Sequence, residues 1–181
     1  PEKWHGLSDV EERFRKRYLD LLMNDDVRRR FVLRSKVISE IRKFLDKEGF
    51  LEVETPVLQT LAGGALAKPF KTRHNALNMD LSLRIAPELY LKRLLVGGFG
   101  KVYEIARNFR NEGIDATHNP EFTMLESYEA YRDADYLMGF AERLVKAAVI
   151  NSVGEEKIKF GGSEINFGGE YPRVKYFDLF K

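Results

Sequence analysis

The sequence predicts an α+β fold in which helices flank a mainly antiparallel sheet. Segments with apolar residues at every third or fourth position indicate helices, and shorter segments of alternating character indicate strands. The strand-like segments come in pairs that are joined by short loops, such as Ile114–Thr117 and Gly161-Gly162-Ser163. Strands joined in this way run antiparallel, because a parallel pair needs a long crossover connection.

Two helices are expected at the start of the chain. In Leu7–Met23, leucine and tyrosine recur at helical spacing, and the basic residues of this segment are interpreted as a solvated face. These residues are Arg13, Arg15, Lys16 and Arg17. Val27–Glu48 has the clearest helical pattern; Asn24 or Asp25 can cap its start, and Gly49 can end it. Its apolar stripe is Val27, Phe31, Ile38, Ile41 and Leu45.

The middle of the chain is predicted to form short strands and one helix. Phe50–Thr55 alternates like a strand, and Pro56 places that strand at a sheet edge or an interface. Gly63-Gly64 permits close approach of another segment. Phe70–Arg84 is predicted to form short strands about a turn at 75–80. A helix then starts at Pro87, which is favoured at a first helical position, and stops at Gly97-Gly98.

The last third predicts one helix, one hairpin and one further strand. Asp133–Val149 carries a helical stripe, which consists of Leu137, Phe140, Leu144 and Ala148. Lys157–Phe160 and Glu164–Phe167 flank the glycine turn of a hairpin. Val174–Phe180 is aromatic and strand-like.

Composition restricts the class of protein. The 181 residues are 44% hydrophobic, which suffices for a sizeable core, and 30 basic residues nearly balance 28 acidic ones. The net charge of +2 does not by itself indicate nucleic-acid binding. The absence of cysteine excludes disulfides and thiolate metal sites. Without a long apolar run or a signal-like start, we expect a cytoplasmic protein with no membrane partner.

The most informative segments are Lys101–Glu112 and Phe122–Ala130. If both are extended and pair as a hairpin, alternate side chains share a face. Arg110 and Glu112 then lie on one face of the first strand, and the aromatic and acidic residues of the second strand also align. Those residues are Phe122, Glu126 and Tyr128. The hairpin could hold a nucleotide through a cation, a flat ring and an acceptor; the alternative is a half-exposed pair with solvated charges.

Several segments together resemble the catalytic domain of class II aminoacyl-tRNA synthetases, specifically the bacterial-type lysyl-tRNA synthetases. The helix and strand at about 27–58 resemble the first signature motif of that class, and the hairpin at about 99–131 resembles the second. The lysine-specific resemblance lies in Leu83–Leu94 and in Gly63-Gly64-Ala65. The resemblance implies that residues 1–181 are part of a single catalytic domain.

The resemblance implies ATP-dependent activation of L-lysine to lysyl-adenylate and its transfer to tRNA(Lys), by a homodimer formed through the first motif. It assigns the catalytic role to Arg110, which would contact the α-phosphate and the lysine carboxylate. The other implied ATP-binding residues are Glu112, His118, Asn119 and Phe122, with Phe122 stacked on adenine.

The resemblance also assigns the lysine pocket. Glu88 and Tyr128 would contact the ε-ammonium group, and Glu126 would contact the α-amino group or a ribose. Gly64 and Ala86 would line the pocket with backbone groups, beside Arg110.

Parts of the family pattern are not found. The glycine-rich third motif with its arginine does not occur, and the anticodon-binding OB domain is also absent. Because the family's Mg²⁺ ligands lie beyond this sequence, the full enzyme is expected to use Mg²⁺ while no residue here is assigned to a metal. With no initiator Met before Pro1 and no terminating signal at Lys181, the chain is expected to be a piece of a longer enzyme, incomplete for catalysis.

Two other functions remain open at this point. One is a lysine ligase paralogue that acts on elongation factor P, which shares the segment His118–Glu126. The other is a non-catalytic fragment that dimerises or contacts RNA. Aspartyl and asparaginyl enzymes share the fold, but Glu88 is an unsuitable partner for their anionic or neutral side chains.

Overall fold

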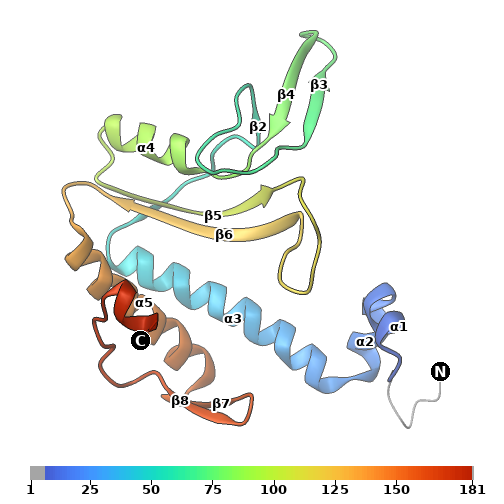
Figure 1. Ribbon diagram of the computed structural model, residues 1–181, viewed down its shortest axis with the longest axis vertical. Helices are drawn as coiled ribbons and strands as arrows, with labels where there is room; N and C mark the ends of the chain where they lie inside the picture. The colour runs from blue at the N-terminus through green and yellow to red at the C-terminus, as the bar shows by residue number, and fades with distance from the viewer. Residues whose placement is uncertain (1–6, 181) are drawn as a thin grey trace. The chain divides into compact units, whose positions relative to one another are not determined.

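The computed structural model describes residues 7–180, and these contain helices and mainly antiparallel strands, which confirms the predicted α+β class (Figure 1). The chain divides into two compact units, one of Pro1–Phe44 with Asp135–Lys181 and one of Leu45–Ala134. Compact units can belong to one domain, so the single catalytic domain stays a prediction. We call the first unit 1 and the second unit 2.

A three-stranded sheet forms the centre of unit 2. Its order is β1 (Leu51–Glu52), β5 (Lys101–Phe109) and β6 (Glu121–Glu129), with β5 and β6 antiparallel and β1 parallel to β5. β1 lies at the edge, as Pro56 predicted, but it is shorter than the predicted Phe50–Thr55. The carbonyl of Thr55 accepts a hydrogen bond from Arg84 Nη1 at 3.0 Å, so this end of the segment leaves the strand ladder.

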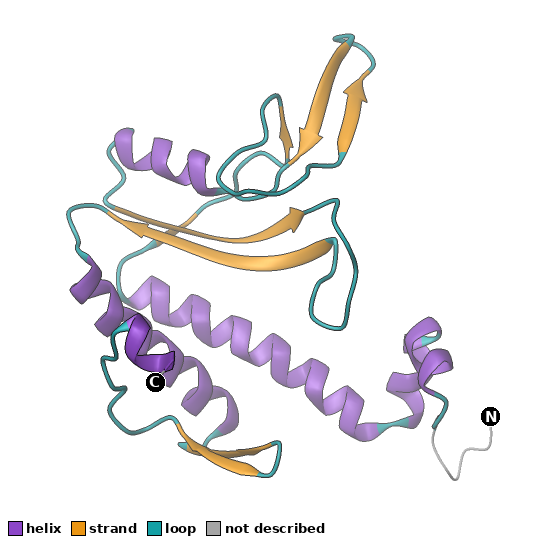
Figure 2. Cartoon of the chain, viewed as in Figure 1, coloured by secondary structure: helices purple, strands orange, loops and turns teal. Residues whose placement is uncertain are grey.

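A second small sheet and a helix complete unit 2. The sheet has the order β2 (Leu58–Gln59), β4 (Met79–Leu83) and β3 (Lys71–His74), and the predicted turn joins β3 to β4 (Figure 2). Helix α4 (Glu88–Val96) begins directly after Pro87, ends at Gly97, and packs against β5 and β6. The side chains of Leu91, Val102 and Tyr103 are fully buried and form the core of the unit.

Unit 1 contains most of α3 (Asp25–Lys47) together with α5 (Ala134–Val153). The Phe44 and Phe140 ring centroids lie 5.6 Å apart, and Lys36 Nζ donates to the Ser152 carbonyl at 2.7 Å. Gly49 has a φ of +83°, which confirms that it supplies the left-handed end of α3.

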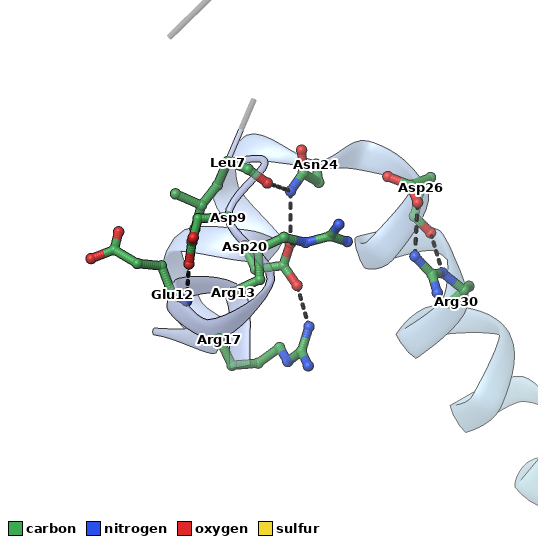
Figure 3. A network of polar contacts seen from close by, with 9 residues as sticks. All are labelled: Leu7, Asp9, Glu12, Arg13, Arg17, Asp20, Asn24, Asp26 and Arg30. Atoms are coloured by element: carbon green, nitrogen blue, oxygen red, sulfur yellow. Dashed lines mark hydrogen bonds and ion pairs between the residues drawn. The ribbon is translucent and has the colours of Figure 1, made fainter. Parts of the chain in front are cut away.

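The first helical segment is broken, so the prediction of one helix over Leu7–Met23 is wrong. The structure has α1 (Val10–Arg15) and α2 (Arg17–Met23), and Lys16 between them has non-helical φ and ψ of −118° and 55°. Asp20 is fully buried and accepts from Arg13 Nε at 2.8 Å, from Asn24 Nδ2 at 2.7 Å and from Arg17 (Figure 3). In a straight helix, residues seven apart rise by about 10 Å, so the break lets Arg13 reach Asp20. Two of the arginines interpreted as solvated therefore neutralise a buried carboxylate.

The last segment of unit 1 confirms one expectation and contradicts another. The predicted hairpin is present as β7 (Lys157–Phe160) and β8 (Ser163–Asn166). The strand predicted over Val174–Phe180 is wrong, because Tyr176–Phe180 forms a short 3₁₀ helix, η1. The ring centroids of Tyr176 and Phe180 lie 5.1 Å apart, a contact between residues four apart that an extended strand would prevent. None of the helices described here is long and apolar enough to cross a membrane.

Glu142 on α5 holds the segment that leads into η1. It accepts from Lys146 Nζ at 2.7 Å, from Arg173 Nη2 at 2.8 Å and from the Tyr171 amide at 3.3 Å. The hydrogen bonds from Lys146 and then Arg173 lower the pKa of Glu142 from its ordinary 4.5 to about 2. A carboxyl group with a lowered pKa in the folded state stabilises that state above its unfolded-state pKa.

Replacing Glu142 with glutamine is therefore expected to lower the free energy of unfolding at pH 7. The difference from the wild type should shrink as the pH falls from about 4.5 through 2, because the folded wild type loses its own charge only below about pH 2. Urea unfolding at a series of pH values measures this effect. Glu164→Gln is a control on the exposed β7–β8 hairpin, where Glu164 pairs with Lys157 at 3.1 Å. A constant difference across this pH range for Glu142→Gln would contradict the assignment.

Candidate nucleotide and amino-acid site

The β5–β6 hairpin aligns the candidate residues as the alternation of the sequence predicts. In the register, Asn108 pairs with Phe122, Glu104 with Glu126, and Val102 with Tyr128. Directly paired residues of antiparallel strands project from the same face, so Phe122, Glu126 and Tyr128 share one side of the sheet. Regular pairing ends at Phe109, one residue before Arg110, so the predicted extended segment up to Glu112 is too long.

Arg110 lies where the hairpin opens. Its amide donates to the Pro120 carbonyl at 2.8 Å, and this hydrogen bond links the two segments of the hairpin one residue beyond the last regular pair. Its Nε donates to the Ile85 carbonyl at 3.4 Å, and its guanidinium carbon lies 5.0 Å from the centre of the Phe122 ring. The arginine is thus held by a backbone contact and an aromatic face, while its remaining N–H groups can bind an anion.

A pocket of about 340 Å³ opens beside this arginine. All five residues predicted to bind ATP line it: Arg110, Glu112, His118, Asn119 and Phe122. The structure therefore brings them together from both sides of the loop, whereas their binding of ATP stays a prediction. The pocket offers a cation, a carboxylate and an aromatic face, a combination that suits a nucleotide.

The loop from Asn111 to Pro120 is shaped by two carboxylates. Asp115 accepts from the amides of Thr117 and His118 at 2.7 and 2.8 Å, and its second oxygen lies 2.7 Å from His118 Nδ1. These contacts, above all the amide of Thr117, hold the pKa of Asp115 well below its ordinary value. Glu112 accepts from the Lys68 amide at 3.3 Å, which ties the loop to the segment before β3. Asp115 was not among the predicted residues, because its role is to shape the turn.

Three residues of the predicted lysine pocket form an acidic group. The Tyr128 hydroxyl donates to Glu126 Oε2 at 2.9 Å, and Glu88 carries its carboxylate on the first turn of α4. Burial raises the pKa of Glu126, and the charges of Glu88 and Glu104 act in the same direction. Glu88 Oε1 accepts from Lys92 Nζ at 2.6 Å, and that ammonium lies 5.9 Å from the Tyr128 ring centre. The acidic group thus already pairs with the ammonium group of the Lys92 side chain.

The glycine loop approaches this acidic group closely. Gly64 has a φ of +87°, and a Cβ atom there would lie 2.9 Å from Glu88 Cβ and 3.3 Å from Ala86 Cβ. The structure therefore brings Gly64, Ala86 and Glu88 together, and only a residue without a side chain fits this contact without displacement. Their contact with lysine stays a prediction.

Replacing Gly64 with alanine is expected to displace Glu88 and to weaken lysine binding by about tenfold or more. Gly49→Ala is the matched control, because Gly49 has a φ of +83° but no atom within 4 Å of an added Cβ. Both variants carry the backbone cost of about 1–2 kcal/mol for a left-handed alanine. Gly64→Ala carries the additional cost of displacing Glu88, so its loss in unfolding experiments should be the larger. Calorimetric titration with lysine should separate them; equal lysine affinity would contradict the close-packing role.

A buried ion pair beside Glu126 was not predicted. Arg84 and Glu104 are each only 4% exposed, and Arg84 Nη1 donates to Glu104 Oε1 at 2.6 Å. One signal for it was available, because Glu104 alternates with Val102 and Ala106 on the buried side of β5. A carboxylate at such a position needs a buried cation.

Within residues 7–180, no three His, Asp or Glu side chains are grouped so that they could hold a metal ion. No chemical step is therefore assigned to a metal bound by this chain.

Comparisons with known proteins identify the family of the chain. The family described as tRNA synthetases class II (D, K and N) matches residues 9–181. The chain is 59% identical over 181 residues to the protein named "Lysine--tRNA ligase" of Pelotomaculum thermopropionicum, and 57% identical to that of Aquifex aeolicus. It is 59% identical over 174 residues to that of Thiobacillus denitrificans. The alignments cover 100%, 100% and 96% of this chain but 36%, 30% and 35% of these relatives. Because the match extends over nearly the whole chain, this chain belongs to the class II tRNA synthetases of the D, K and N group.

Proposed function

We propose that this chain forms the ATP- and lysine-binding surface of a lysine–tRNA ligase, which makes lysyl-adenylate and transfers lysine to tRNA(Lys). The observation that carries the proposal is the position of Arg110 between an aromatic-lined pocket and an acidic group. Relatives that are 56–59% identical to this chain carry the name lysine–tRNA ligase, which supports the proposal.

The proposed chemistry needs no protein nucleophile. A carboxylate oxygen of lysine attacks the α-phosphorus of ATP, a new P–O bond forms, and the bond to pyrophosphate breaks as pyrophosphate leaves. Arg110 neutralises the lysine carboxylate and the α-phosphate, which bear like charge and must approach one another. Phe122 stacks on adenine, Glu112 accepts from the adenine amino group or the loop, and His118 and Asn119 contact the outer phosphates.

Lysine has two ammonium groups, and the site offers two carboxylates, Glu88 and Glu126. We assign these carboxylates, with the Tyr128 hydroxyl, to the two ammonium groups, while Gly64 and Ala86 line the pocket between them. A partly buried ammonium needs such a counter-ion, because an unpaired charge would be costly to desolvate. Neutral amino acids of similar length lack one of these charges, so this arrangement selects lysine.

The homodimer is part of the same proposal. On α3, in the segment that resembles the first signature motif, Phe31, Val32 and Leu33 are 47%, 64% and 38% exposed. A run of exposed apolar residues on a long helix suits burial against a second copy. Analytical ultracentrifugation of the wild type and of Val32→Asp tests this part.

Lysine-dependent exchange of labelled pyrophosphate into ATP tests the proposed activity. The assay requires a polypeptide of the relatives' length that carries this sequence. We expect exchange with lysine but not with aspartate or asparagine, followed by transfer to tRNA(Lys). Exchange with lysine but transfer only to elongation factor P would favour the paralogue. If the protein shows no exchange and binds neither ATP nor a lysyl-adenylate analogue, the result would favour the alternative of a non-catalytic fragment.

A further inference from the structure

The buried residues Arg84 and Glu104 and the partly buried Thr55 form a polar cluster beside Glu126, which we call the Arg84 cluster. Arg84 Nη1 donates to Glu104 Oε1 at 2.6 Å, to the Thr55 carbonyl at 3.0 Å and to Thr55 Oγ1 at 3.1 Å. Thr55 Oγ1 in turn donates to Glu104 Oε2 at 2.6 Å. Both carboxylate oxygens of Glu104 therefore have donors, although the residue is only 4% exposed.

Arg84 also links its own segment to two others that are distant in the sequence. Its Nε donates to the Arg107 carbonyl on β5 at 2.8 Å. Its own amide donates to the Val57 carbonyl at 2.8 Å, and its carbonyl accepts from the Phe109 amide at 3.0 Å. The residue is thus bonded to the segment after β1 and to the last residues of β5, through its main chain and its side chain alike.

The bonded segments carry the two halves of the proposed site. Ala86 and Glu88, on the lysine side, follow Arg84 by two and four residues. Arg110 follows Phe109 directly and donates from Nε to the Ile85 carbonyl at 3.4 Å. A change in how Arg84 is held would therefore shift Glu88 relative to Arg110, which are the groups proposed to hold opposite ends of lysine.

Stability alone is a weak explanation for a buried ion pair, because packed apolar residues of similar size often stabilise a fold as well or better. The charge of Glu104 also acts on the site, since Glu104 lies directly opposite Glu126 in the β5–β6 register. The guanidinium of Arg84 balances this charge from the buried side. Its planar fork can reach Glu104 and the Arg107 carbonyl together, a geometry that a lysine ammonium cannot reproduce.

We propose that Arg84, held by Glu104 and Thr55, is a positioning residue that sets the placement of Glu88 relative to Arg110 and so determines affinity for the amino-acid substrate. This inference rests on the proposed lysine-activating function. Neither Arg84 nor Glu104 contacts the substrate in this proposal. The nucleotide pocket is lined by residues from the loop and from β6, and the proposal predicts that it is affected less.

The test compares Arg84→Met with the double variant Arg84→Met/Glu104→Met in a polypeptide of the relatives' length. The single variant leaves a buried carboxylate without its cation and should unfold at a lower temperature. The double variant removes both charges and should regain most of that loss. Arg107→Met is the matched control, because the Arg107 side chain is exposed on β5 and contacts Glu121 at 3.4 Å, while its carbonyl is retained.

Pyrophosphate exchange then gives KM for lysine and for ATP separately. If Arg84 positions Glu88, KM for lysine rises about ten- to a hundredfold in the double variant despite its restored stability, while KM for ATP changes little. If the double variant regains both stability and the wild-type KM for lysine, the cluster is only structural and the inference is overturned. Arg84→Lys should retain the charge but not the low KM. A wild-type protein without lysine-dependent exchange would instead refute the proposed function, which distinguishes the two failures.

Discussion

Replacing Arg110 with alanine is expected to reduce lysine-dependent pyrophosphate exchange by about two orders of magnitude or more, the effect of losing a donor aimed at developing charge. Arg110 lines the pocket proposed to hold the nucleotide, and its charge acts on Glu126 of the acidic group. Without it, the lysine carboxylate and the α-phosphate would approach one another with their repulsion unscreened. The loss should appear in kcat as well as in KM, because the charge is needed most in the transition state.

This variant should remain folded, which makes the measurement interpretable. The Arg110 side chain bonds the Ile85 carbonyl at 3.4 Å and lies over Phe122, whereas its amide, which alanine retains, makes the 2.8 Å bond to Pro120. Arg107→Ala is the control, since it removes an exposed arginine of β5, three residues before Arg110. An exchange rate for Arg110→Ala within a few fold of this control would remove Arg110 from the chemistry.

Replacing Glu88 with glutamine is expected to give the second largest effect, on lysine affinity. The change keeps the size of the side chain but removes the charge that would face an ammonium group. A hydrogen bond to a charged group contributes about 1.5–3 kcal/mol, which corresponds to a loss of about ten- to a hundredfold in affinity. Affinity for ATP should be unchanged, because Glu88 does not line the nucleotide pocket. Calorimetric titration with lysine and with ATP measures both.

Two controls isolate the role of Glu88. Glu121→Gln makes the same chemical change at an exposed position on β6, where the carboxylate contacts Arg107 at 3.4 Å. Lys92→Met removes the internal ammonium that lies 2.6 Å from Glu88 Oε1, and it should leave lysine affinity equal or higher because a competitor is lost. If lysine binds Glu88→Gln as tightly as the wild type, Glu88 is not part of the pocket.

The parts of the fold that the sequence predicts well are governed by local rules. Alternation in 101–112 and 122–130 predicts which side chains share a face. The register confirms it where 101–109 pairs with 121–129, because the period of a strand is two residues. Gly49 and Gly97 end their helices as expected, since a helix end depends on a few neighbouring dihedral angles. The five residues predicted to bind ATP meet in one pocket for the same reason, as all belong to one hairpin.

The parts that were missed depend on tertiary contacts. The break at Lys16 serves a carboxylate at Asp20 that becomes fully buried, and helical periodicity does not show which charge will be buried. Arg84 and Glu104 are 20 residues apart, and Thr55 is 49 residues from Glu104, so no local pattern links the three. The 3₁₀ helix at Tyr176–Phe180 replaces a predicted strand because aromatic residues favour strands only where a partner strand is available.

The division of the chain into units has a consequence for the order of folding during synthesis. Unit 2 is one continuous stretch, Leu45–Ala134, whereas unit 1 joins both ends of the chain, and its bond from Lys36 to Ser152 spans 116 residues. Closing a longer loop costs more entropy, and contacts between distant residues form more slowly. We therefore expect unit 2, with every candidate residue from Gly64 to Tyr128, to complete its contacts while the nascent chain is still attached to the ribosome. Unit 1 must wait until α5 has emerged, so the candidate residues of unit 2 are in place before the helices of the other unit can meet.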